Sequence, residues 1–171
     1  RFGAAFTSVA ATDGTYGIGD ALTITATWDS AVSVTGIPTL TLSNGDSATY
    51  FSGTGSTTLS FITTVADGDN DASDLSVSAY AGTITADDDS SNAGAASGDL
   101  GSVTVDGDAP DLSSVADAGD ASLGVGETHT ITVTWDEAVI VTGSPTLTLG
   151  NSASAAYTSG TGTSALVFTY T

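Results

Sequence analysis

Apolar and polar residues alternate along this chain in short stretches, a pattern typical of β-strands with one buried face. Leu22, Ile24 and Trp28 share one face of such a stretch, and threonines occupy the other. Gly, Asn, Asp and Ser lie between the stretches and favour turns. The pattern predicts strands at residues 6–10, 21–28, 38–43, 47–51, 57–65, 75–80 and 102–105, with a short extra one at 83–85. It predicts a core of Leu22, Ile24, Trp28, Leu40, Leu42, Leu59, Phe61, Leu75 and Val77.

The chain contains an internal repeat. Residues 27–64 and 134–171 align without gaps at an offset of 107, and 24 of the 38 aligned positions are identical. Upstream, the match continues with a one-residue slip, so that Val9 corresponds to Val115. We therefore expect one unit at residues 1–108 and a second at 109–171, the latter ending after its fifth strand without counterparts of residues 65–108.

A repeat of about 106 residues is too long for a solenoid and suits independent domains in tandem. Seven short strands in such a unit predict an all-β fold of tandem immunoglobulin-like antiparallel β-sandwiches. The cysteine pair of many immunoglobulin domains is absent, because the chain has no Cys.

Composition excludes several functions. The chain has 171 residues, a net charge of -19 and one Lys or Arg, so we expect neither nucleic-acid binding nor attraction to an acidic membrane surface. No apolar run is long enough to span a bilayer. A hydrophobic fraction of 40% argues against a disordered acidic tail. The first residue is not Met, which indicates a processed chain or a piece of a longer one.

The stretch TWDSAVSVTGIPTLTLSNGDSATYFSGTGSTTLSF and the linker VDGDAP resemble the bacterial immunoglobulin-like repeats of long cell-surface proteins and giant adhesins. The resemblance covers nearly the whole chain. It implies an extracellular or cell-surface location, a spacing or load-bearing role, and neighbouring repeats as partners. It also implies calcium between domains.

Acidic residues are concentrated in part of the chain, with 13 of the 20 between Asp67 and Asp120. Asp67, Asp69 and Asp71 alternate as in the start of a calcium loop. Ala72 stands where an EF-hand has glycine, and no helix is expected on either side, so an EF-hand is excluded. Calcium binding through oxygen ligands and a merely solvated turn both remain open.

The linker adds Asp106 and Asp108, which follow the last strand of unit one. In an alternating strand order they lie at the same end as the loop at 67–74, and Asp136 of unit two is expected to face them. Like charges within a Debye length of about 8 Å repel, and a calcium ion would relieve that repulsion. The alternative is an acidic surface adapted to salt.

Other candidates have simpler interpretations. Asp87, Asp88 and Asp89 point in different directions along one stretch and predict a hydrated loop. His129 aligns with Leu22 and is expected to pack, and Trp28 and Trp135 alternate with core residues instead of forming a glycan platform. A Ser-His-Asp triad would need His129, which has no nucleophile elbow nearby, so we expect no enzyme activity.

Three roles remain for the chain. The first is a structural spacer repeat of a surface fibre or adhesin, stiffened by calcium at the junction. The second is a filament subunit that assembles with like subunits by strand complementation. The third is a module for a glycan or another cell-surface ligand.

Overall fold

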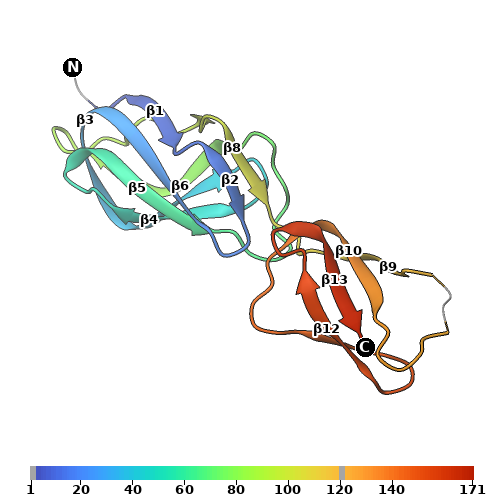
Figure 1. The fold of residues 1–171 in the computed structure, drawn as a ribbon. Helices are drawn as coiled ribbons and strands as arrows, with labels where there is room; N and C mark the ends of the chain where they lie inside the picture. Colours follow the sequence, from blue (N-terminus) through green and yellow to red (C-terminus); the bar gives the residue numbers. More distant parts are fainter. Residues whose placement is uncertain (1–2, 120–121) are drawn as a thin grey trace. The chain divides into compact units, whose positions relative to one another are not determined.

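The computed structural model describes residues 3–119 and 122–171, and the regular structure in these ranges is all β. The chain forms two compact units, Arg1–Ala109 and Pro110–Thr171, coloured from blue to yellow and from yellow to red in Figure 1. Between residues 3 and 119 and from 122 onward, no helix has the length and hydropathy needed to cross a membrane.

Unit 1 contains eight strands in the described residues. They are β1 (Phe6–Ala11), β2 (Gly14–Gly17), β3 (Ala21–Leu42), β4 (Ser47–Ser52), β5 (Ser56–Thr64), β6 (Ser76–Ala86), β7 (Gly98–Asp99) and β8 (Val103–Asp106). All pairings among them are antiparallel except that of β2 with β8.

The 22-residue strand β3 organises unit 1, because its two halves pair with different neighbours. Its first half pairs with β1 and β5, and residues Val32–Thr35 pair with the end of β6. The register shifts between Thr35 and Thr39, next to Pro38, which has no N–H to donate. The two strands expected at 21–28 and 38–43 are therefore one bent strand.

The core of unit 1 is apolar throughout. All nine residues predicted for it are buried, and Trp28 is only 2% exposed. Later segments complete this core, since five of their residues are buried in the same cluster as residues of β3 and β5: Leu75, Val77, Ile84, Leu100 and Val103. No polar or charged residue is buried in the described ranges.

Strands β2 and β8 run parallel and lie side by side in unit 1 (Figure 1). Gly14 pairs with Val103 and Gly17 with Asp106, and the Gly14 N–H donates to the Ser102 carbonyl at 3.0 Å. The alternation pattern did not predict β2, because its four residues include two glycines and its partner is distant in the sequence.

Unit 2 contains β9 (Leu112–Asp117), β10 (His129–Val139), β11 (Thr146–Thr148), β12 (Ser154–Ser159) and β13 (Thr163–Tyr170). These strands form one antiparallel sheet in the order β11-β12-β13-β10-β9. Its small core consists of Ile131, Val133, Ala155, Leu166 and Phe168.

The repeat extends to individual hydrogen bonds. The Tyr50 hydroxyl accepts the Thr54 N–H at 3.0 Å, and the equivalent Tyr157 hydroxyl accepts the Thr161 N–H at 2.8 Å. Both tyrosines also contact a phenylalanine edge to face, at 6.0 Å in unit 1 and 5.8 Å in unit 2. The two hairpins are therefore the same structural unit formed twice.

Candidate functional site

The predicted acidic loop and the linker lie together within unit 1. The Gly68 N–H donates to the Gly107 carbonyl at 2.9 Å, and Ala72 and Val105 exchange two backbone hydrogen bonds. The expectation that this loop and the exit of the last strand share one end of the unit is therefore confirmed. Reciprocal amide bonds between Asn44 and Asn70 attach the same loop to the turn after β3.

Two of the predicted calcium ligands cap backbone groups in this loop. The Asp69 carboxylate accepts the Ala66 N–H at 2.7 Å, and the Asp71 carboxylate accepts the Gly107 N–H at 2.9 Å. Such charge-assisted bonds close the loop and hold it against the end of β8. The arrangement gives these carboxylates a role that needs no cation.

The other predicted ligands of unit 1 differ in exposure. Asp67 and Asp108 are exposed, and Asp106 is half-buried in β8. Within residues 3–119 and 122–171, no group of three or more carboxylate or imidazole side chains is close enough together to hold a metal ion. Calcium at this loop remains a prediction from the spacing of the aspartates.

Asp136, the predicted ligand in unit 2, has a role inside its own unit. Its carboxylate accepts the Asp111 N–H at 2.8 Å, and its N–H donates to the Asp111 carbonyl at 3.0 Å. In unit 1, Asp29 makes the same pair of bonds with Ala5, at 2.7 and 3.0 Å. This carboxylate therefore fastens the residue before β1 to β3 in unit 1 and the residue before β9 to β10 in unit 2.

The second acidic cluster, Asp87 to Asp89, forms an exposed turn, as expected. The Ser91 hydroxyl and N–H both donate to the Asp89 carboxylate, at 2.6 and 3.0 Å. These bonds, with the hydroxyl first, hold the pKa of Asp89 below its ordinary value of 3.8.

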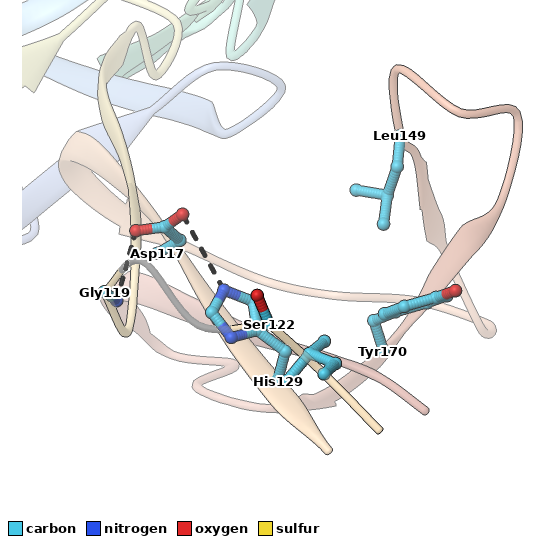
Figure 2. A pocket seen from close by; sticks show the side chains of 7 residues that line it. Asp117, Gly119, Ser122, His129, Leu149 and Tyr170 are labelled. Atoms are coloured by element: carbon cyan, nitrogen blue, oxygen red, sulfur yellow. Dashed lines mark hydrogen bonds and ion pairs between the residues drawn. The ribbon is translucent and has the colours of Figure 1, made fainter. Parts of the chain in front are cut away.

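His129 lies at the edge of a hollow in unit 2 (Figure 2). Its Nε2 atom is 3.7 Å from the Oδ2 atom of Asp117, and the Oδ1 atom of the same carboxylate accepts the Gly119 N–H at 3.2 Å. Leu149 and Tyr170 stand on the other side of the hollow. Ser122 also lines it, and no hydrogen bond between its hydroxyl and the imidazole is found among the described residues.

Unit 2 has a second, more apolar hollow on the same sheet. Its lining includes Val115 of β9, Ile131 of β10, and Leu147 and Leu149 around β11. A third hollow lies beside Trp135 and Leu166. We call the surface formed by Val115, Trp135, Leu147 and Leu149 the open face of unit 2.

The two tryptophans differ in one hydrogen bond. Trp28 donates its indole N–H to the Gly94 carbonyl at 2.9 Å. The indole nitrogen of Trp135 is buried but has no partner in the described part of the chain. The sequence predicted that both rings pack and did not predict this difference. The difference could have been expected from the alignment, because Gly94 lies within residues 65–108 and this range has no counterpart in unit 2.

A scan against protein-family models found no family that matches this chain. A search of curated proteins found no matching relative.

Proposed function

We propose that this chain is a structural spacer repeat of an extracellular surface fibre or adhesin. The observation that carries the proposal is the duplication of the same hydrogen bonds in the two units, namely those of Asp29 and Asp136 and those of the two tyrosine hairpins. A spacer requires repeated stable units and no reactive group. Its cores are apolar, and its many carboxylates lie at the surface, where they keep the chain soluble.

The location and the spacer role are tested together in the source cells. An antibody against unit 1 should label intact cells, and labelling only after permeabilisation would contradict an extracellular position. Unit 1 is then replaced in the gene by an unrelated β-sandwich of similar length. A spacer keeps the reach and the adhesion of the parent protein after this exchange. Loss of adhesion with unchanged reach would instead identify unit 1 as the binding module.

Calcium belongs to the proposal as a stiffening ligand at Asp67, Asp69, Asp71, Asp106 and Asp108. The alternating spacing supports it, although Asp69 and Asp71 already hold the loop by direct hydrogen bonds. If calcium binds only the folded state, the melting temperature rises with calcium concentration at fixed ionic strength. Magnesium at equal concentration is the control. A melting temperature that EDTA leaves unchanged would remove calcium from the proposal.

A further inference from the structure

The open face of unit 2 is equivalent to a face that is covered in unit 1. There the segment of residues 72–106, which we call the covering segment, contributes buried Leu75, Val77, Leu100 and Val103. Val9 of β1 is 8% exposed beneath it, whereas the equivalent Val115 of β9 is 59% exposed. Exposed aliphatic surface of this kind favours binding of apolar side chains.

Backbone groups at the edge of the sheet differ in the same way. In unit 1 the covering segment extends the edge of β1, because the Ala11 N–H donates to the Leu100 carbonyl at 3.1 Å and the Gly94 N–H to the Ala4 carbonyl at 2.8 Å. Among the described residues of unit 2, β9 pairs with β10 alone, and all six residues of β9 are exposed. An edge strand with free N–H and C=O groups accepts a further strand.

A third difference concerns the residues after β10. In unit 1, Ser33–Thr35 of β3 are held in a strand by Thr83–Thr85 of β6. The equivalent residues 140–142 of unit 2 form no strand, and Ile140 is 75% exposed. The strand conformation of this stretch therefore depends on the partner that the covering segment supplies.

The indole N–H of Trp135 indicates which chemical group the occupant must supply, namely a hydrogen-bond acceptor. A buried donor without an acceptor is costly, and Trp28 shows which acceptor satisfies it. Trp28 pairs in register with Phe6, and Trp135 pairs in register with Leu112. Gly94, whose carbonyl accepts the Trp28 N–H, lies beside Phe6, which is the residue that corresponds to Leu112.

We propose that the open face of unit 2 is a docking surface for a β-segment of the same type as residues 72–106. The occupant pairs with β9 and with residues 140–142, buries its alternate apolar side chains on Leu147, Leu149 and Val115, and presents a glycine carbonyl to Trp135. This complementation concerns the folding unit alone, so it does not depend on the spacer role.

A second copy of the chain is a poorer source of this segment. Its own residues 72–106 are already buried in its unit 1, and releasing them would expose Leu75, Leu100 and Val103. Its strand β1 is likewise paired with β3. The favoured occupant is therefore an additional segment of this type and not one withdrawn from a folded unit 1.

The test extends the chain after Thr171 with a second copy of residues 65–108, because Thr171 aligns with Thr64. NMR resolves the two indole N–H signals, and Trp28 serves as the internal reference. Docking should slow hydrogen exchange of the Trp135 indole by roughly tenfold or more, toward the rate of Trp28. The amides of residues 140–142 should become protected as well.

The matched control carries valine in the appended copy at the position of Gly94. A Cβ atom at Gly94 would lie 2.7 Å from the Phe6 nitrogen, so valine should block the same approach over Leu112. Unchanged Trp135 exchange in the extended chain with glycine would overturn the proposal. The proposal would also be overturned if the Trp135 indole were protected in the unextended chain and this chain dimerised in a concentration-dependent way. The occupant would then be a second copy of the chain.

Discussion

Asp29 and Asp136 show how one side chain fixes the start of each unit. Each carboxylate accepts the N–H of a residue in the segment leading into the first strand, at 2.7 and 2.8 Å. The backbone bond that runs the other way measures 3.0 Å in both units. The linker that precedes β9 is therefore attached to unit 2 by Asp111.

Asp136→Ala should lower the free energy of unfolding of unit 2 by about 1 kcal/mol, because the Asp111 N–H loses its acceptor. Asp136→Asn keeps an oxygen in place and should cost less than half of that. Urea unfolding followed by NMR signals of unit 2 gives both values. Equal losses for the two variants would mean that the charge, and not the hydrogen bond, is what matters.

The aspartates also show where residue-level prediction reached its limit. Their alternation at positions 67, 69 and 71 was visible in the sequence, but the partner of Asp71 is a backbone N–H 36 residues away. Carboxylates that accept backbone N–H groups and carboxylates that bind calcium have the same local pattern. Only the fold distinguishes which oxygen atoms are already engaged.

At the scale of elements, the hairpin between β4 and β5 depends on two glycines with positive φ. A Cβ atom at Gly53 would lie 2.2 Å from the Thr58 carbonyl oxygen, whereas Gly55 has open space around it. Gly160 and Gly162 repeat this contrast between β12 and β13, with 2.1 Å to the Ala165 oxygen. The turn therefore requires glycine at its first position for space as well as for conformation.

Gly53→Ala should destabilise unit 1 by at least about 3 kcal/mol, because it adds a backbone clash to the positive φ of 113°. Gly55 has a φ of 80°, and an added Cβ atom would meet no other atom there. Gly55→Ala should therefore lower the free energy of unfolding by only about 1 kcal/mol. Thermal unfolding of the two variants measures the difference. Similar losses would show that the hairpin shifts to accommodate the new atom.

The strand pattern was predicted well where one face of a strand is buried. Some strands whose pairing partners are distant in the sequence were not predicted. Residues 29–37 lie between the strands predicted at 21–28 and 38–43, yet Val32–Thr35 are strand because β6 lies beside them. The equivalent stretch of unit 2, without β6, is not a strand, which shows that the pairing and not the local sequence decides. The alternation of apolar and polar residues was sufficient to predict the all-β class.

For the whole molecule, charge is the dominant property, with 20 acidic residues against one Lys or Arg. Repulsion between carboxylates destabilises the compact state, and salt screens it. Raising sodium chloride from about 0.05 to 0.5 M should therefore increase the melting temperature by several degrees. Calorimetry in sodium chloride measures this. A melting temperature that falls with salt would mean that specific ion pairs outweigh the general repulsion.

The parallel pairing of β2 with β8 gives unit 1 a mechanical property. Tension on the two ends of the unit pulls β2 and β8 in opposite directions along a common axis. The hydrogen bonds between Gly14–Gly17 and Val103–Asp106 are then loaded in shear, all at once, instead of opening one after another from an end. Forced unfolding is governed by the rate at which such a barrier is crossed. Unit 1 should therefore resist extension until this pair of strands slides as a whole.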